Sequence, residues 1–306
     1  MKPVSVLSQI GLSLIALSML SVPPALAAPA AAQSVAAPLP ADTRFTMTVV
    51  GKGADVILIP GLSSPRAVWD GAVGAVGSDH RLHLVQIRGF GGDDAGPNVK
   101  GPLLDQTVEQ LADYIRANKL EHPAIVGHSM GGLIALMLAK RHPELVGRVM
   151  IVDALPFIGA IMMPDPSVAK IEPIAAALRD RMAATYGQPA NAAANAQIAQ
   201  TNALKPASQA QVAQWIAAAD PRVTALGLYE DMTADLRADM AGITAPITLL
   251  YPWSAGRLPQ AQADGFYHAA YKDAPNVTYV PVGDSGHFIM LDQSEAFLAA
   301  LKTFLK

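Results

Sequence analysis

The sequence contains no cysteine among its 306 residues. Disulfide bonds, thiolate metal sites and a lipid anchor on an N-terminal cysteine are therefore excluded. The sequence also has no excess of positive charge, because its 22 Lys and Arg are outnumbered by 25 Asp and Glu, which gives a net charge of −3. That balance does not suit a nucleic-acid-binding protein. Only 15% of the residues are charged and 51% are hydrophobic, which excludes a disordered chain.

The first residues have the order of a secretory signal peptide. Met1-Lys2-Pro3 carries one positive charge, Val4 to Leu20 is uncharged and mostly apolar, and Ala25-Leu26-Ala27 offers small residues for cleavage. We therefore interpret residues 1–27 as a signal peptide and expect a periplasmic or secreted protein. A retained membrane anchor is the alternative, although the apolar run is short for a span. Residues 28–43, rich in Ala and Pro, are predicted to form a flexible linker.

Residues 44–306 alternate between strand-like and helix-like segments. Helical spacing occurs over residues 105–118, 133–140 and 293–305. Strand-like runs occupy residues 44–50, 55–59, 82–87, 124–126, 148–152, 247–250 and 277–280. This alternation predicts an α/β domain with a mostly parallel central sheet flanked by helices. No strand pattern occurs between about residues 154 and 242, where Ala-rich helical stretches predict an inserted helical cap.

The motif Gly127-His128-Ser129-Met130-Gly131-Gly132 lies between a short apolar strand and a helix. This is G-x-S-x-G in the context that the motif requires. Side chains at the glycine positions would clash in so tight a strand-to-helix turn. The turn exposes the Ser129 hydroxyl at a helix N-terminus, where developing negative charge is favoured. Ser129 is therefore the predicted nucleophile.

At this motif the chain resembles the α/β-hydrolase superfamily, in its capped, serine esterase-like branch. Two further sites carry the resemblance, Pro60-Gly61-Leu62 after an early strand and Gly283 to Phe288 near the C-terminus. It implies an α/β-hydrolase fold with a helical cap. It also implies that His287, in the loop after the last strand, is the catalytic base. The backbone N–H groups of Leu62 and Met130 are the implied oxyanion donors, although Pro-Gly-Leu also suits an ordinary turn.

The acid of the catalytic triad departs from the most familiar pattern. Many relatives carry an Asp in the loop after the penultimate strand, but residues 251–259 contain no acid. Asp153 ends a core strand, at the edge where parallel sheets gather their functional residues, and is the first choice. Asp264 and Asp284 are the alternatives. A chain that has lost its acid and is catalytically weak is a further possibility.

The start of the cap suggests an apolar substrate. Residues 155–163 are almost wholly apolar, and adaptable methionines suit a pocket wall as well as a core. The candidate substrate-binding residues are Trp69, Phe157, Met162 and Trp253. His128 is interpreted as a support for the nucleophile turn. The other five histidines are interpreted as surface or core residues: His80, His83, His122, His142 and His268.

The predicted activity is hydrolysis of a small or medium apolar carboxylic ester through an acyl-enzyme. Lactonase, C–C hydrolase and perhydrolase reactions use the same residues, and a ligand-binding relative without turnover is the alternative outside enzymes. The sequence has no H-E-x-x-H and no P-loop, and Gly89-Phe90-Gly91-Gly92 lacks dinucleotide-binding spacing. We therefore expect a small-molecule ester as partner and no metal, cofactor, nucleic acid or membrane span in the mature chain.

Expression of the full chain in an exporting bacterium tests the signal peptide. We expect the exported protein to have the intact mass of a chain that begins at Ala28. Replacing Ala25 and Ala27 together by leucine is expected to leave the segment attached, because signal peptidase needs small residues there. Wild-type protein that keeps residues 1–27 in the membrane fraction would contradict cleavage and favour the anchor.

Overall fold

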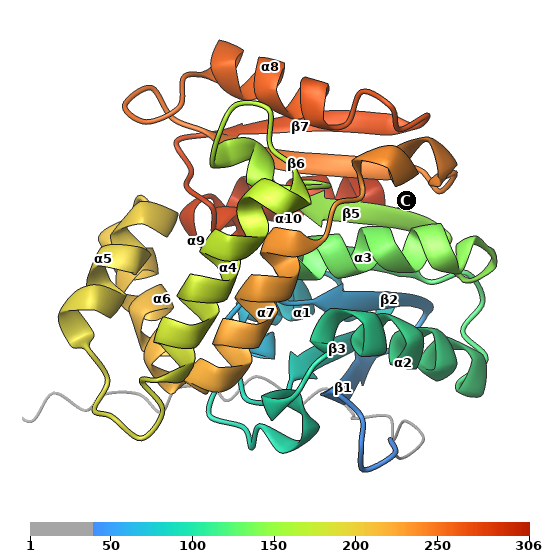
Figure 1. The fold of residues 1–306 in the computed structure, drawn as a ribbon. Helices are drawn as coiled ribbons and strands as arrows, with labels where there is room; N and C mark the ends of the chain where they lie inside the picture. The colour runs from blue at the N-terminus through green and yellow to red at the C-terminus, as the bar shows by residue number, and fades with distance from the viewer. Residues whose placement is uncertain (1–38) are drawn as a thin grey trace, which may run out of the picture. The chain divides into compact units, whose positions relative to one another are not determined.

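A computed structural model describes residues 39–306 (Figure 1). The predicted signal peptide and residues 28–38 of the predicted linker lie outside the described residues. The rest of the predicted linker is part of the fold, which corrects our boundary. Leu39 packs against the core, and Thr43 is buried with its N–H donating to the carbonyl of Pro40 at 3.1 Å. A single apolar side chain gave too weak a sequence pattern to show this packing.

The centre of the fold is a sheet of seven strands in the order β1-β3-β2-β4-β5-β6-β7. Strand β1 is antiparallel to β3, and every other neighbouring pair is parallel. The strands are β1 (Phe45–Gly51), β2 (Ala54–Ile59), β3 (His80–Ile87), β4 (Ala124–His128), β5 (Arg148–Val152), β6 (Ile247–Trp253) and β7 (Val277–Gly283). The mostly parallel α/β sheet predicted from the sequence is confirmed.

Helices cover both faces of the sheet (Figure 1). One face packs against α2 (Leu103–Ala117), α3 (Met130–Arg141) and α8 (Gln260–Ala270). The other packs against α1 (Asp70–Val76), α9 (Ile289–Asp292) and α10 (Ser294–Phe304). Successive strand residues supply the two cores alternately, as the pleat requires: Ile57 and Ile59 face α3, whereas Val56 and Leu58 face α1 and α10.

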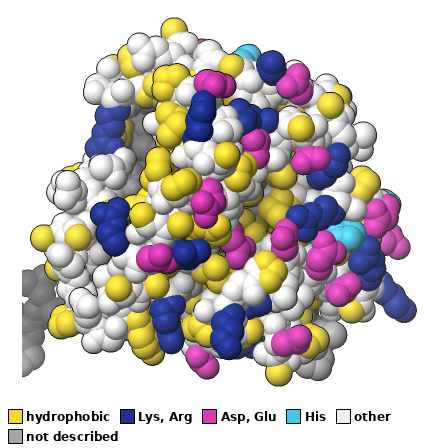
Figure 2. All heavy atoms as spheres, viewed as in Figure 1, with side chains coloured by type: hydrophobic (Ala, Val, Ile, Leu, Met, Phe, Trp, Pro, Cys, Tyr) yellow, Lys and Arg dark blue, Asp and Glu magenta, His cyan; other side chains and the backbone are white. Residues whose placement is uncertain are grey.

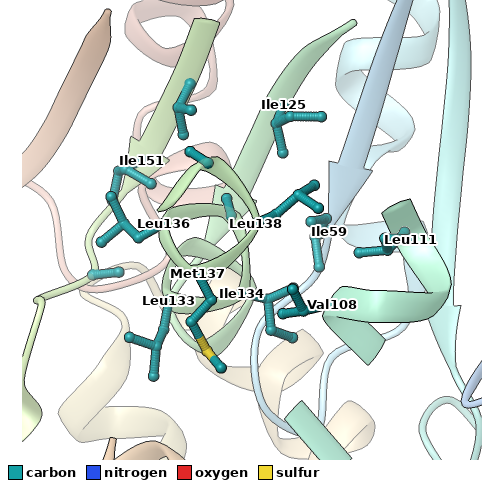
Figure 3. Packing of buried hydrophobic residues seen from close by; sticks show 14 of the residues in the cluster. Ile59, Val108, Leu111, Ile125, Leu133, Ile134, Leu136, Met137, Leu138 and Ile151 are labelled. Atoms are coloured by element: carbon teal, nitrogen blue, oxygen red, sulfur yellow. The ribbon is translucent and has the colours of Figure 1, made fainter. Parts of the chain in front are cut away.

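The buried helix α3 organises the first of these cores. Figure 3 shows its side chains Leu133, Ile134, Leu136, Met137 and Leu138 among residues of the strands and of α2. Residues 130–139 of this helix are all buried, so the helix lacks a polar face over that length. A helix that is apolar all round is fixed by packing on every side. Its N-terminus, which follows Ser129, is therefore held rigidly.

The cap lies between β5 and β6 and contains helices only, as predicted. It consists of the short 3₁₀ helix η4 (Ile158–Ile161), then α4 (Val168–Ala183), α5 (Ala192–Asn202), α6 (Pro206–Ala218), α7 (Pro221–Thr233) and η5 (Arg237–Gly242). Figure 1 shows α4 and α7 side by side next to the sheet. Within residues 39–306, no helix has the length and apolar character needed to cross a membrane.

Helix α7 was not predicted, although its start carries a recognisable signal. The Asp220 side chain accepts a hydrogen bond from the N–H of Arg222 at 2.8 Å, and Pro221 occupies the first helical position. Asp at the N-cap followed by Pro is a typical helix start. Other elements cover α7 on several sides, so its apolar residues do not follow one face. The sequence therefore lacks the apolar periodicity that would have predicted this helix.

Glu230 ties α7 to the hydrolase core. Its carboxylate accepts hydrogen bonds from the N–H of Leu103, at 2.8 and 2.9 Å, and of Leu104, at 2.7 Å. These groups open α2, whose N-cap residue Pro102 provides no side-chain cap. A carboxylate at a helix N-terminus satisfies free N–H groups and complements the helix dipole. Burial raises the pKa of Glu230.

Replacing Glu230 by alanine tests this clamp. We expect the free energy of unfolding to fall by about 1.5–3 kcal/mol, because the first N–H groups of α2 lose a charged acceptor. Urea denaturation measures the change. Glu121→Ala is the matched control, because Glu121 is exposed. Equal losses in the two variants would contradict a specific clamp.

Candidate active site

Ser129 occupies the turn between β4 and α3 in a strained backbone conformation, with φ 54° and ψ −125°. Glycines make this turn possible. A Cβ at Gly131 would lie 2.3 Å from the carbonyl oxygen of Ile59, and one at Gly127 would lie 2.2 Å from the carbonyl oxygen of Gly131. Strained backbone at a non-glycine residue is typical of a functional site. The predicted role of the glycines is therefore confirmed at these two positions.

The structure brings Ser129, Asp153 and His287 to the wall of one cavity. Asp153 Oδ2 and His287 Nδ1 are 2.6 Å apart and share a hydrogen bond. The other oxygen, Oδ1, accepts a hydrogen bond from the hydroxyl of Tyr267. Both carboxylate oxygens are thus engaged, and His287 Nδ1 carries the proton that Asp153 accepts. This tautomer leaves His287 Nε2 as an acceptor.

The alternative acids have other partners. Asp264 lies on α8 and accepts a hydrogen bond from the Tyr251 hydroxyl at 2.7 Å. Asp284 is exposed, and its side chain does not line the cavity. Asp153 is therefore the one acid of the three predicted candidates that is bonded to His287.

The sequence did not predict the part that Tyr267 plays. Tyr267 is on α8, stacks on Tyr251 with ring centroids 4.6 Å apart, and is buried. Burial raises the pKa of its phenol well above the usual value, and the neighbouring Asp153 carboxylate adds to this shift. Tyr267 therefore remains a hydrogen-bond donor to Asp153. An isolated Tyr within an amphipathic helix gives no sequence signal for this contact.

His128 contacts the loop of His287, whereas the sequence predicted a support for the nucleophile turn. Its Nε2 lies 3.1 Å from the carbonyl oxygen of His287, and the two rings lie 4.5 Å apart between centroids. Complete burial lowers the pKa of His128 well below the usual value, and the charge of His287 adds to this. His128 is therefore neutral and donates Nε2–H to that carbonyl.

Asp292, another residue that the sequence did not single out, anchors the same loop to the cap. Its buried carboxylate accepts hydrogen bonds from the N–H of Gly286 at 2.9 Å and of Leu204 at 2.8 Å. Gly286 also contacts the cap closely, because a Cβ there would lie 2.8 Å from the carbonyl oxygen of Asn202. The position of His287 thus depends on the link between α5 and α6.

The loop after β2 lies against the serine, where the resemblance places oxyanion donors. A Cβ at Gly61 would lie 3.0 Å from Cβ of Ser129, so Leu62 follows directly beside the nucleophile. Among the hydrogen bonds of residues 39–306, neither the Leu62 N–H nor the Met130 N–H has an acceptor. Two free backbone donors next to a serine suit the developing charge of an oxyanion.

The cavity at Ser129 has a volume of about 170 Å³. Its apolar wall comes from residues that follow β5 and open the cap: Ala154, Leu155, Ile158 and Ile161. This supports the prediction that the beginning of the cap lines a pocket, but with different side chains.

Acidic and basic side chains are interspersed over the face of the molecule in Figure 2.

None of the four predicted substrate-binding residues lines this cavity, which corrects that prediction. Trp69 is fully buried and packs on Phe297, with ring centroids 5.9 Å apart. Phe157 is buried in the core of the cap. Trp253 packs against Gly283, where a Cβ would lie 2.6 Å from its ring. Met162 is 38% exposed on the cap. The large aromatic side chains near the site therefore pack against neighbouring parts of the fold instead of lining the cavity.

A second carboxyl group, Asp231 of α7, also lines the cavity. It is 8% exposed, and among residues 39–306 it has no hydrogen bond or ion pair. Burial raises its pKa to about 7, although the charge of His287 acts in the opposite direction. The sequence did not single out Asp231, because its helix was not predicted.

The raised pKa of Asp231 predicts a pH-dependent stability. The folded protein releases this proton near pH 7 and the unfolded chain near 3.8, so the folded state binds more protons between these values. The free energy of unfolding is therefore higher near pH 4, where Asp231 is protonated in the folded protein. It falls by up to about 4 kcal/mol as the pH rises through about 7. Asp231→Asn removes the ionisation. We expect the variant to unfold at a higher temperature than the wild type at pH 8, with the difference shrinking towards pH 4. An equal difference at both values would contradict the raised pKa.

Comparison with known proteins places the chain in a family. A family model described as the alpha/beta hydrolase family matches residues 56–300. The pimeloyl-[acyl-carrier protein] methyl ester esterase of Nitrosomonas europaea is 25% identical over 240 residues, which cover 72% of this chain and 90% of the relative. The corresponding enzyme of Vibrio atlanticus is 24% identical over 269 residues, covering 84% and 96%.

Solved structures share the fold. The enol-lactonase from Burkholderia xenovorans has a TM-score of 0.68 and 20% identity, covering 85% of this chain and 96% of that one. A thermophilic esterase from Thermogutta terrifontis has a TM-score of 0.70 and 18% identity, covering 85% and 92%. The resemblance seen in the sequence is confirmed, and this chain belongs to the alpha/beta hydrolase family.

Proposed function

We propose that the protein is a serine hydrolase that cleaves carboxylic esters of small, largely apolar acids or alcohols through an acyl-enzyme. The observation that carries this proposal is the 2.6 Å hydrogen bond between Asp153 and His287 in the cavity that Ser129 also lines. A base oriented by an acid beside a serine on a strained turn is the arrangement that activates a hydroxyl. Two relatives are named as ester hydrolases, which supports the same bond type.

Acyl transfer begins at the serine. His287 Nε2 accepts the proton of Ser129 Oγ as that oxygen attacks the ester carbonyl carbon. The resulting imidazolium is stabilised by Asp153, which stays ionised. The carbonyl oxygen becomes an oxyanion and accepts hydrogen bonds from the N–H groups of Leu62 and Met130. The positive end of α3 adds to this stabilisation.

Collapse of the tetrahedral intermediate breaks the bond to the alkoxy oxygen, which takes the proton from His287 and leaves as the alcohol. Water then attacks the acyl-enzyme with His287 again as base. The acid is released and the Ser129 hydroxyl is restored. Tyr267 holds Asp153 from its other side, so the carboxylate cannot rotate away from His287 during the cycle.

The small cavity favours short acyl or alkoxy groups. Ligand pockets for drug-sized molecules have volumes of roughly 300–1,000 Å³. A cavity of about 170 Å³ with an aliphatic wall suits substituents of a few carbon atoms. A binding protein without turnover is the rival, but free oxyanion donors and an oriented base have no use in binding alone.

We further propose that the enzyme acts outside the cytoplasm. The order of charge, apolar run and small-residue cleavage site in residues 1–27 supports this location.

Hydrolysis of p-nitrophenyl esters from acetate to octanoate tests the proposed function. We expect acetate and butanoate to be the best substrates. Ser129→Ala is expected to lower kcat by roughly 10⁴-fold or more, because the nucleophile is lost. Asp153→Asn is expected to lower it by roughly 10³- to 10⁴-fold, because His287 then adopts the wrong tautomer.

Asp284→Asn is the matched control, since Asp284 is an exposed acid three residues from His287. It should keep wild-type rates. Equal background rates for the wild type and Ser129→Ala would refute the serine mechanism. A full loss in Asp284→Asn with none in Asp153→Asn would refute the assigned acid.

A further inference from the structure

Asp231 is a carboxyl group in the cavity for which the proposed acyl transfer has no use. The two oxygens of Asp153 are occupied by His287 and Tyr267, so Asp153 has no free acceptor for a substrate. The Asp231 carboxyl has no partner among the described residues and lines the same cavity as the nucleophile. It is therefore the carboxyl group that a bound substrate meets there.

The position of Asp231 follows from the face that α7 presents to the site. Thr224 contacts Ser63 through their hydroxyls at 2.9 Å, in the loop after β2. Gly227 comes next, where a Cβ would lie 2.9 Å from Leu62 and 3.2 Å from Sδ of Met130. Asp231 continues the spacing of three and four residues that keeps side chains on one helix face. The helix therefore places Gly227 against Leu62 and Met130, and Asp231, one turn further on, in the cavity that Ser129 lines.

Among residues 39–306, Asp231 has no Lys or Arg as an ion-pair partner. Asp153 and His287 line its cavity, and no Lys or Arg does. Most charged groups on α7 and on the elements packed against it are engaged elsewhere: Glu230 with α2, Arg222 with Asp220, Glu172 with Tyr229, Lys170 with Asp165, Arg179 with Asp180, Arg141 with Asp105, Lys140 with Asp239, and Arg237 with Asp235. Arg181 of α4 is exposed. The short helices η4 and η2 (Gly96–Val99) carry no titratable side chain.

We propose that Asp231 makes this site selective for esters that carry a positively charged nitrogen, which its carboxylate binds beside the scissile bond. The proposal rests on the proposed esterase activity. A buried carboxylate is stable only when it is paired or hydrogen-bonded, and a cationic nitrogen supplies that pair. The aliphatic wall of the cavity receives the carbon chain next to it. A negatively charged substituent would meet two carboxyl groups and no Lys or Arg side chain.

The same arrangement makes the selectivity depend on pH. In the free protein burial holds the pKa of Asp231 near 7. Below that pH the group is neutral and attracts a cation weakly. Above it the group is ionised, so the preference for cationic substrates rises between about pH 6 and pH 8. His287 acts as the base on charged and neutral esters alike.

Two pairs of isosteric esters measure the preference. The acyl-side pair is p-nitrophenyl β-alaninate against p-nitrophenyl butanoate, which exchanges an ammonium for a methyl group. The alcohol-side pair is acetylcholine against 3,3-dimethylbutyl acetate. The quantity measured is the ratio of kcat/KM for the charged ester to that for the neutral ester, from pH 5.5 to 8. Taking this ratio cancels every pH effect that the two esters of a pair share.

In the wild type we expect the ratio to rise with pH for at least one pair. In Asp231→Asn we expect that ratio at pH 8 to fall roughly tenfold or more and to lose its pH dependence, the size expected for a hydrogen bond to a charged group. The kcat/KM for the neutral ester should fall by less than that for the charged ester. Asp284→Asn, which removes an exposed acid, should retain the wild-type ratio.

Three results would overturn the proposal. The first is an unchanged ratio for both pairs in Asp231→Asn. The second is an equal loss for neutral and charged esters, which would make Asp231 part of the chemistry rather than of selectivity. The third is no turnover that depends on Ser129 for any ester, which would remove the proposed function and this inference together. The first two leave the esterase intact, so the two failures are distinguishable.

Discussion

The site depends on how closely α3 approaches the ends of two neighbouring strands. Gly131 lies so near the carbonyl oxygens of Ile59 and Pro60 that a side chain there would overlap both. This contact sets the loop after β2 beside the turn after β4. These two strands are neighbours in the sheet, but the chain continues from β2 to β3 on one side and from β4 to β5 on the other. Such a switch point is where open parallel sheets bind their ligands. The strained backbone of Ser129 is held because α3 is buried along its length. Ser129, Leu62 and Met130 are therefore positioned by one packing contact.

The acid at the end of β5 is supported by a second set of contacts. Asp153 bonds to His287 and to Tyr267 of α8, so both oxygens of this partly buried carboxylate are satisfied. The loop after β6, where many relatives carry the acid, serves a different purpose here. The carbonyl of Trp253 accepts the N–H of Ser285 at 3.3 Å, and its ring packs on Gly283. That loop steadies the histidine loop instead of supplying the charge.

Sequence patterns predicted the sheet and the nucleophile turn, because both are local. The role of His287 was implied by the family resemblance, and Asp153 was the first choice among three acids because it ends a core strand. A strand of alternating or continuous apolar residues and a glycine-bounded serine can be recognised within ten residues. Tyr267, Asp292 and Asp231 could not be found in this way, since their roles come from contacts with distant segments. The failure with Trp69 and Phe157 has the opposite cause. Large apolar side chains near a site fit a pocket wall or a core equally well, and only three-dimensional packing decides between them.

Helix α7 unites the cap with the proposed chemistry. Glu230 stabilises the start of α2, whereas the next residue, Asp231, holds a carboxyl group in a cavity where ionisation is costly. A change of Asp231 to an apolar residue would relieve that cost without loosening the helix, so packing alone gives no reason for an acid there. The stabilising clamp at Glu230 and the contact of Gly227 with Leu62 fix α7 firmly enough to keep the unpaired carboxyl next to Ser129. Asp231 has no hydrogen-bond or ion-pair partner among residues 39–306, and the proposed cationic substrate would supply one.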